Sequence, residues 1–502
     1  ISDDRCIHVV THPEVEDYRS PATLEVGDVD PDDASGPCCG IRNVTDNGGR
    51  TLDGMLFAYR LRELIGPARR LVEHFGFCSH QSCFVPFSVE LDRNPQESSP
   101  PCSRRSSMIA APEPRSIGRA PSTTRSTLHA MAVSATYLHE FVEPLGYLDF
   151  AAIGPPSRRV CAAVADAYAR VAEPQGNMGA PILGAYEAAL GTAGRVLGVA
   201  PELVTVVPST SAGLFRIAFG LAPFGGNIVV PSHEFPANVY PWLRAAGMGG
   251  PEIRRVDIPD RRITAGALSE AVDDETRAIA VSWVDYLSGF RCDLGSLREL
   301  ADDSLLIVDA IQGLGAFEFP VALADVVVAG GQKWLRSGWG SGLMALSPRS
   351  LEMLHPTLTG WWGVEDSFDW DAPPPHTARS DAEQFQDGSP PLFGAFALRA
   401  ALEVVEAEGI RAIQAAVMEN VAAAEDVISA AGGEILALWD RDDERSGILA
   451  FRFEDEPSAQ VTQRLDDAEI IVSERGGWVR VAPHASTDPG VFDVLAEVLH
   501  NG

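Results

Sequence analysis

Two short segments of this chain end in side chains that could do chemistry together. Leu305–Val308 runs directly into Asp309, and Val326–Val328 is followed a few residues later by Lys333. Apolar runs of this length are typical of strands buried on both faces of a parallel sheet, and ligands gather beyond their carboxyl ends. A lysine there could form a Schiff base, and a carboxylate could keep a pyridine nitrogen protonated. The two segments therefore predict a pyridoxal phosphate site.

The residues around the lysine favour a buried setting. A single lysine after a strand is usually a solvated surface charge. Here Gly330 and Gly331 precede Lys333, and Trp334 follows it, which indicates a tightly packed loop. Burial would lower the pKa of the amine and make it nucleophilic. The alternative for Asp309 is a strand-end aspartate that only caps the next helix.

Several apolar segments in the second half of the chain have strand length and are separated by helical patterns. The expected strands are 204–207, 228–230, 278–284, 305–308, 326–328 and 343–346, with helices such as 211–221 and 294–301 between them. This alternation predicts an α/β fold whose mostly parallel central sheet has helices on both faces. Two long helices, 392–408 and 410–431, and short strands at 448–453, 470–472 and 478–481 then predict a smaller α+β domain at the C-terminal side.

The composition divides the chain unevenly. Residues 94–127 are rich in Ser, Pro and Arg, so we expect residues 1–130 to be a poorly ordered or non-native extension, apart from one candidate helix over 52–75. We expect 131–180 to be a segment that joins the small domain. The large cofactor-binding domain is expected over 181–375 and the small domain over 376–502.

Charge and composition exclude several classes of function. A formal net charge of −31 argues against a nucleic-acid partner, which needs a basic surface. No apolar run approaches the roughly 20 residues that cross a bilayer, and no secretory signal opens the chain, so no membrane partner and a cytoplasmic location are expected. The cysteines lack the spacing of a zinc site, so no metal is expected.

From about Tyr147 onward the motifs stand in the order of a known family. These are Tyr147–Pro155, Pro208–Gly213, Asp309 with Gln312, Lys333, and Trp478–His484. The chain resembles the class V aminotransferases, which are fold-type-I pyridoxal phosphate enzymes. That family includes cysteine desulfurases, selenocysteine lyases, kynureninases and isopenicillin N epimerase-like proteins. The resemblance implies pyridoxal 5′-phosphate as cofactor and a homodimer with its site at the subunit interface.

The resemblance also implies roles for the residues around the cofactor ring. Lys333 matches the Schiff-base lysine, Asp309 the partner of the ring nitrogen, and Gln312 the partner of the ring hydroxyl. Phe235 stands where a ring-stacking histidine is common, and a phenyl ring can stack but cannot transfer protons. Tyr286 lies in a segment where many relatives have asparagine, closer to the kynureninase pattern, and would border the substrate.

Further roles concern the phosphate and the substrate carboxylate. Ser211, with Thr210 beside it, would bind phosphate at a helix N-terminus, helped by Gln332, Trp362 and Ser389, the last acting toward the neighbouring subunit. Arg480 would hold the α-carboxylate, because its planar fork pairs with both oxygens. Two departures accompany these matches. Gly330 replaces a hydroxyl residue, and Gln384 replaces a common arginine.

These assignments indicate an enzyme that acts on a small amino acid or related amine, with transamination preferred. A lyase, an epimerase or a kynureninase-like hydrolase on the same scaffold is the alternative, and a non-catalytic cofactor-binding regulatory module is the alternative from another class. A classical cysteine desulfurase is disfavoured because the sequence has no cysteine after Cys292 to serve as the thiol nucleophile.

Overall fold

The structure is a computed structural model that describes residues 133–500, except 178, 370, 372–373 and 437–438. The extension expected over residues 1–130, including the candidate helix over 52–75, lies outside the described residues. Everything below concerns the unit from Ser122 to Gly502.

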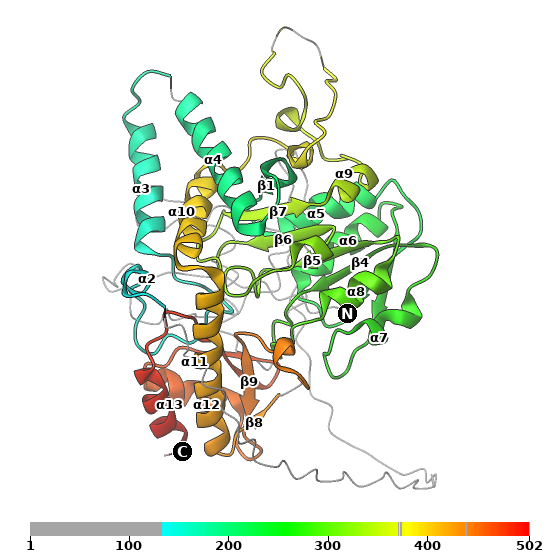
Figure 1. The fold of residues 1–502 in the computed structure, drawn as a ribbon. Coiled ribbons are helices and arrows are strands. Elements are labelled where there is room, and N and C mark those ends of the chain that lie inside the picture. Colours follow the sequence, from blue (N-terminus) through cyan, green and yellow to red (C-terminus); the bar gives the residue numbers. More distant parts are fainter. Residues whose placement is uncertain (1–132, 178, 370, 372–373, 437–438, 501–502) are drawn as a thin grey trace, which may run out of the picture. The chain divides into compact units, whose positions relative to one another are not determined.

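A seven-stranded sheet forms the centre of the described part of the chain (Figure 1). Its strands, in spatial order, are β1 (Val204–Val206), β7 (Gly342–Leu346), β6 (Val326–Gly330), β5 (Leu305–Asp309), β4 (Thr276–Ser282), β2 (Asn227–Pro231) and β3 (Glu252–Val256). The β3–β2–β4–β5–β6 pairs are parallel, and β7 runs antiparallel to both β6 and β1. The mostly parallel sheet expected from the sequence is therefore confirmed.

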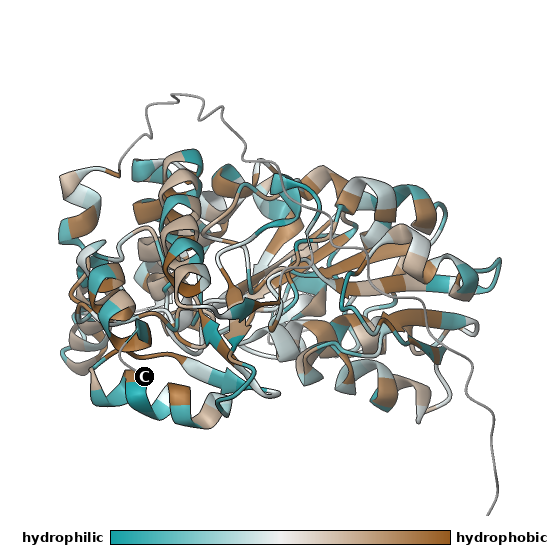
Figure 2. Cartoon of the chain, turned by 90° about the horizontal axis from the view of Figure 1, so that it is seen from below, coloured by the Kyte–Doolittle hydropathy of each residue, from teal (hydrophilic) through white to brown (hydrophobic). Residues whose placement is uncertain are grey.

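The strand residues alternate between two hydrophobic cores, one on each face of the sheet. Ile279, Leu306 and Val308 belong to the first core, whereas Ala280 and Ile307 belong to the second. Both faces are covered by helices, so every strand position from Leu305 to Asp309 is buried. Figure 2 shows the same feature as strands coloured mainly hydrophobic between helices of mixed colour. Burial on both faces explains why these strands read as continuous apolar runs.

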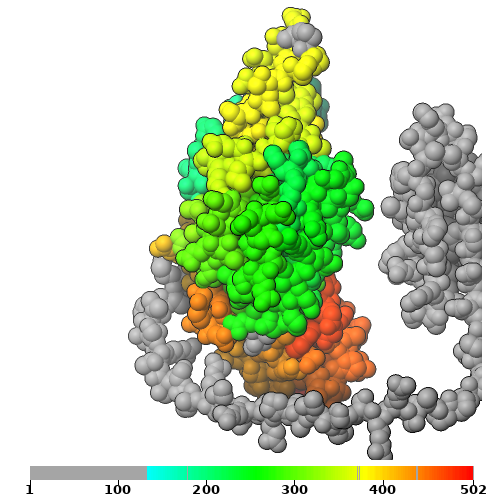
Figure 3. Space-filling model, turned by 90° about the vertical axis from the view of Figure 1, so that its right-hand side faces the viewer, coloured from blue at the N-terminus to red at the C-terminus, as the bar shows by residue number. Residues whose placement is uncertain are grey.

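Helices follow several strands of the large domain. They are α5 (Thr210–Leu221), α6 (Tyr240–Ala246), α7 (Ala265–Leu268), α8 (Leu294–Ala301) and α9 (Pro348–Met353). Before the sheet come α2 (Ala135–His139), α3 (Arg158–Ala172) and α4 (Gly179–Leu197), and α10 (Leu392–Glu408) packs on α3 and α4. The segment between α9 and α10 projects beyond the helices of the large sheet, in yellow in Figure 3.

A second, four-stranded antiparallel sheet forms the smaller α+β domain. Its order is β10 (Ser473–Arg475), β11 (Trp478–Val481), β9 (Leu449–Arg452) and β8 (Glu434–Ile435), with α11 (Ile410–Ala430), α12 (Ser458–Asp467) and α13 (Gly490–His500) beside it. The strand expected at 470–472 begins at Ser473 instead. Ile471 forms only an isolated bridge with Tyr147 of the N-terminal segment.

No helix among the described residues has the length and hydrophobicity needed to span a membrane.

Candidate active site

Lys333 and Asp309 lie at the carboxyl ends of neighbouring strands. Asp309 is the last residue of β5 and pairs with Val328 of β6, and Lys333 follows three residues after the end of β6. Asp309 is 2% exposed, and its Oδ1 accepts a hydrogen bond from the Ile311 amide. The two charged groups are close enough for each to shift the pKa of the other. The amine and the acid therefore lie near each other in the folded chain, while their joint role toward a cofactor stays a prediction.

Burial changes the ionisation of both groups. It raises the pKa of Asp309 to about 6, although the Ile311 amide and the Lys333 ammonium act to lower it. Burial also lowers the pKa of Lys333 to about 8, with Asp309 opposing the shift. At pH 7 roughly one Lys333 side chain in ten would be a free amine, against about one in three thousand for an ordinary lysine. The amine is therefore nucleophilic near neutral pH.

The loop that carries the lysine is fixed from several directions. The Gly330 amide donates to Thr210 Oγ1 (2.8 Å), and the Gly331 amide donates to the Ser341 carbonyl (2.7 Å). The Gln332 carbonyl accepts from the amide of Gly154 in the N-terminal segment (2.7 Å). A Cβ on Gly331 would lie 1.9 Å from Ser337 Oγ, so only glycine fits there. Glycine at these positions gives the close packing that the sequence predicted.

The N-terminus of α5 faces the same loop. Ser209 caps the helix by accepting from the Ala212 amide (3.1 Å), and Ser211 lies in the first turn, partly exposed. The Thr210 hydroxyl is buried and contacts the end of β6 through Gly330. A Cβ on Gly330 would lie 2.6 Å from Gln332 Oε1 and 3.2 Å from Thr210 Oγ1. The absence of a side chain at Gly330 thus leaves room for the Gln332 amide beside the helix N-terminus, an arrangement suited to an anion.

Phe235 presents an aromatic ring beside the lysine. Its ring centroid lies 5.3 Å from Lys333 Nζ, yet the residue is 45% exposed. Tyr286 meets it edge to face, with ring centroids 5.5 Å apart. An open phenyl face next to a buried amine is what a stacked pyridine ring needs.

Gln312 has two partners within the chain. Its amide nitrogen donates to the Ala151 carbonyl (3.0 Å), and its oxygen accepts from Trp334 Nε1 (2.9 Å). The amide nitrogen carries a second N–H, which could still reach a ring hydroxyl. The role of Gln312 toward the cofactor therefore stays a prediction.

Arg480 lies in the small domain and faces the large one. It is 2% exposed and donates from Nη1 to the Tyr286 carbonyl (2.8 Å) and from Nη2 to Asp149 Oδ1 and Ser473 Oγ (both 3.1 Å). Its Nε is buried and has no hydrogen-bond partner. Its charge also acts to lower the pKa of Lys333. A fixed guanidinium with one unpaired N–H is a suitable anchor for a carboxylate.

Two expected phosphate ligands lie on the segment between α9 and α10. Trp362 Nε1 donates to Glu383 Oε2 (2.6 Å), so its N–H already has a partner within the chain. Ser389 is exposed, and Gln384, which replaces a common arginine, is 5% exposed and donates to the Asp381 carbonyl (3.2 Å). The contacts of Trp362 and Ser389 with a cofactor remain predictions.

Three residues near the site were not singled out from the sequence. Asp149 pairs with Arg480, and Glu234 is a buried acid that binds the backbone N–H and the hydroxyl of Ser282. Arg261 forms an ion pair with Asp285 at the base of the Tyr286 turn. Asp149 stands inside the Tyr147–Pro155 motif and Glu234 directly precedes Phe235, but Arg261 follows a partly exposed edge strand that carried no signal.

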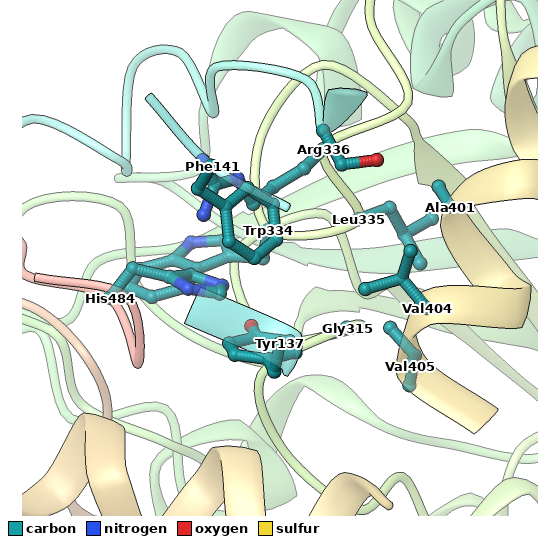
Figure 4. A pocket seen from close by; sticks show the side chains of 11 residues that line it. Tyr137, Phe141, Gly315, Trp334, Leu335, Arg336, Ala401, Val404, Val405 and His484 are labelled. Atoms are coloured by element: carbon teal, nitrogen blue, oxygen red, sulfur yellow. The ribbon is translucent and has the colours of Figure 1, made fainter. Parts of the chain in front are cut away.

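A small cavity of about 10 Å³ lies behind the lysine loop (Figure 4). Trp334, Arg336 and His484 line it, and the His484 ring lies 5.7 Å from that of Trp334. The volume is too small for a substrate. The more exposed side chains near the lysine are Phe235, which is 45% exposed, and Tyr286, which is partly exposed.

The residues present fit pyridoxal 5′-phosphate. The Lys333 amine suits its aldehyde, the buried Asp309 suits its ring nitrogen, and the open face of Phe235 suits its ring. The N-terminus of α5 suits its phosphate, and the unpaired N–H of Arg480 suits the carboxylate of a substrate. Within the described part of the chain, no cluster of three His, Cys, Asp or Glu side chains could hold a metal ion.

Comparison with known proteins gives a consistent result. The family model described as aminotransferase class-V matches residues 146–485. An uncharacterized aminotransferase, YcbU, of Bacillus subtilis is 26% identical over 295 residues, which cover 58% of this chain and 76% of the relative. A probable cysteine desulfurase of Methanothermobacter thermautotrophicus is 25% identical over 326 residues, which cover 60% of this chain and 80% of the relative. A kynureninase of Pseudomonas fluorescens is 28% identical and covers 49% and 63%.

Solved structures share the fold. A cysteine desulfurase from Thermococcus onnurineus in its apo form has a TM-score of 0.64 at 20% identity, covering 71% of this chain and 94% of that one. The cystine C-S lyase C-DES, in complex with cysteine persulfide, has a TM-score of 0.65 at 17% identity, covering 70% and 97%.

Proposed function

Because this chain belongs to the class V aminotransferase family, whose cofactor is pyridoxal 5′-phosphate, we propose that it is a transaminase acting on an α-amino acid. The observation that carries the proposal is the geometry around Lys333. A partly buried amine with a pKa of about 8 lies near the buried acid Asp309, and the charge of the buried Arg480 acts on the same amine. These three groups are enough to hold the cofactor and to bind an α-amino acid.

Each residue has a distinct task. When bound, the cofactor supplies an aldehyde that condenses with an amine and a ring that takes up the electron pair released at Cα. Lys333 would hold the cofactor, and its amine would take the proton from the substrate Cα. Asp309 would stay ionised beside the ring nitrogen, and Arg480 would hold the α-carboxylate and so orient the substrate. Thr210, Ser211 and Gln332 would bind the phosphate, and Phe235 would stack on the ring.

Two observations favour transamination over the other reactions of the family. Phe235 stands where an imidazole is common and cannot transfer protons itself, so we assign proton transfer at Cα to Lys333, and transamination can use a single such group. The sequence has no cysteine after Cys292, so a desulfurase thiol in the usual place is missing. The relative with an aminotransferase name agrees with this choice.

We also infer a homodimer with the site near the interface, as is usual in the family. Support comes from large apolar side chains exposed on the described surface, among them Tyr168 (57%), Trp339 (70%) and Trp361 (42%). Apolar surface of this kind is common where a partner covers it.

The decisive experiment is a visible-absorption titration of the purified full-length chain, loaded with cofactor, against a panel of L-amino acids. We expect one or more amino acids to shift the cofactor band and to yield the corresponding 2-oxo acid with pyridoxamine phosphate. The Lys333→Ala variant is expected to bind the cofactor without the band of the lysine-bound form.

Other outcomes would overturn the proposal in identifiable ways. A cleaved side chain would indicate a lyase or a kynureninase-like hydrolase, and inversion at Cα without a 2-oxo acid would indicate an epimerase. An unchanged spectrum with every amino acid and amine would indicate a non-catalytic regulatory module.

A further inference from the structure

An ion pair beside the site is both buried and held by two hydrogen bonds. Arg261 lies between β3 and α7, with a positive φ of 58°. Its Nε and Nη2 donate to the two carboxylate oxygens of Asp285 at 3.0 and 2.6 Å. The two side chains are 14% and 4% exposed. A buried, two-pronged Arg–Asp pair is both strong and directional, unlike an exposed surface pair.

The Asp285 carboxylate also folds the turn that follows β4. Its Oδ1 accepts from the amides of Leu287 (3.1 Å) and Ser288 (2.7 Å) and from the Ser288 hydroxyl (2.9 Å). The turn closes with the Gly289 amide on the Asp285 carbonyl (3.0 Å), where Gly289 has a φ of 75°. The carboxylate therefore fixes the position of Tyr286, the residue at the tip of this turn.

Tyr286 connects the turn to the proposed substrate anchor. Its carbonyl accepts from Arg480 Nη1 (2.8 Å), and its ring meets Phe235 edge to face. The Arg261 guanidinium lies 5.1 Å from the centroid of the same ring. Arg261 Nη2 also donates to the carbonyl of His233, two residues before Phe235 (3.2 Å). One guanidinium thus contacts both segments that present aromatic rings to the site.

We propose that Arg261 is a positioning residue, which acts through Asp285 and the Tyr286 carbonyl to orient Arg480 for the α-carboxylate of the substrate. The inference rests on the proposed function and names the interaction that selects an amino acid over a simple amine. Arg480 Nη2 contacts Asp149 and Ser473, whereas Nη1 is held by the Tyr286 carbonyl of the large domain. Loosening the Tyr286 turn would therefore free the Arg480 guanidinium at Nη1.

The test compares Arg261→Lys, which keeps the charge but loses the fork, with Arg254→Gln, a control that removes an arginine outside the Tyr286 turn. Arg254 lies on β3 and pairs with Asp273 at 2.6 Å, away from the Tyr286 turn. For an amino acid that the wild type converts, we expect Arg261→Lys to raise KM about tenfold or more, while the KM of the amine lacking its carboxylate stays within about twofold. Arg254→Gln should leave both values unchanged.

Asp285→Asn tests the path of the effect. Because both residues act through one turn, we expect the effects of Arg261→Lys and Asp285→Asn on the amino-acid KM to be non-additive in the double variant. Equal rises in KM for the amino acid and the amine, together with a fall in melting temperature, would show that the Arg261–Asp285 pair is only structural. That result would overturn the proposal.

A readout that needs no turnover separates this inference from the proposed function. Propionate cannot react, but its carboxylate can bind Arg480, and its affinity for the cofactor-loaded protein can be followed by the cofactor absorbance. We expect weaker propionate binding in Arg261→Lys and unchanged binding in Arg254→Gln, even if no amino acid proves to be a substrate. Equal propionate affinity in all three proteins would contradict the positioning role.

Discussion

At the scale of single residues, burial decides which groups near the site carry charge. Lys333 and Asp309 are both shifted toward their neutral forms, but each opposes the shift of the other, so the pair keeps a reactive amine beside an ionisable acid. Glu234 has a different environment. It is 8% exposed, and burial raises its pKa to about 8, against the lowering effect of its hydrogen bonds with Ser282. Near pH 7 Glu234 is therefore mostly a neutral acid next to Phe235.

The raised pKa of Glu234 predicts that this residue makes the stability of the folded chain depend on pH. In the unfolded chain the carboxyl ionises near its ordinary pKa of 4.5, whereas in the folded chain it stays protonated up to about pH 8. Between these values the folded state binds more protons, so the contribution of Glu234 to stability falls as pH rises. Glutamine resembles the protonated acid. We expect Glu234→Gln to gain melting temperature relative to the wild type as pH rises from about 5 to 8.

The measurement is a thermal melt of the cofactor-free protein at several pH values. Above about pH 8 the difference between the two proteins should become constant, because the carboxyl is then ionised in both states. A difference that does not change across the window would contradict the neutral form of Glu234.

At the scale of elements, the lysine loop depends on close backbone contacts with the N-terminal segment. The amide of Gly154 donates to the Gln332 carbonyl, and a Cβ on Gly154 would lie 2.0 Å from the Lys333 carbonyl oxygen. Backbone atoms cannot move aside as a flexible side chain can. The position of Lys333 therefore depends on an element that is far away in the sequence.

Gly154→Ala is expected to destabilise the protein by about 1–3 kcal/mol, because the new methyl group forces the two backbones apart. The same change should weaken cofactor retention, measured by the absorbance left after dialysis. Gly184→Ala is the matched control, since Gly184 lies within α4 with nothing within 4 Å of an added Cβ, and alanine favours a helix. Equal cofactor retention in the two variants would contradict the role of Gly154.

At the scale of the whole molecule, the family match and the described fold begin at different residues. The match starts at 146, but Ser134 donates from its amide and hydroxyl to Glu408, and Glu143 forms a buried ion pair with Arg336 at 2.9 Å. Arg336 also contacts the rings of Phe141 and Phe150. The fold thus uses residues that precede the family motifs.

We expect a chain of residues 131–502 to fold, to bind the cofactor and to form the proposed dimer. A chain of residues 146–502 should be less stable by about 3–5 kcal/mol, because it removes the buried Tyr137 ring and both Phe141 and Glu143 from Arg336. Denaturant unfolding and light scattering would compare both with the full chain. Loss of cofactor binding in the 131–502 chain would show that the first 130 residues belong to the functional protein.

The sequence by itself determined the fold class and the amine–acid pair. Strands buried on both faces are continuous apolar runs, so β5 and β6 could be predicted together with Asp309 and Lys333 at their ends. The edge strand β3 was missed because Glu252–Val256 is charged and partly exposed, and β8 was missed because it has only two residues. Hydrophobic periodicity reveals strands that are buried, and β3 and β8 are buried only in part.

Only the tertiary structure decided which groups surround that pair. The contact of Arg480 with Asp149 spans 331 positions, that of Arg480 with the Tyr286 carbonyl spans 194, and Arg261 reaches Asp285 from a loop that has no motif. The burial that shifts the pKa values of Lys333 and Glu234 likewise comes from packing between distant segments. Local sequence patterns record which residues are apolar or reactive, but not which remote side chain will satisfy a buried charge.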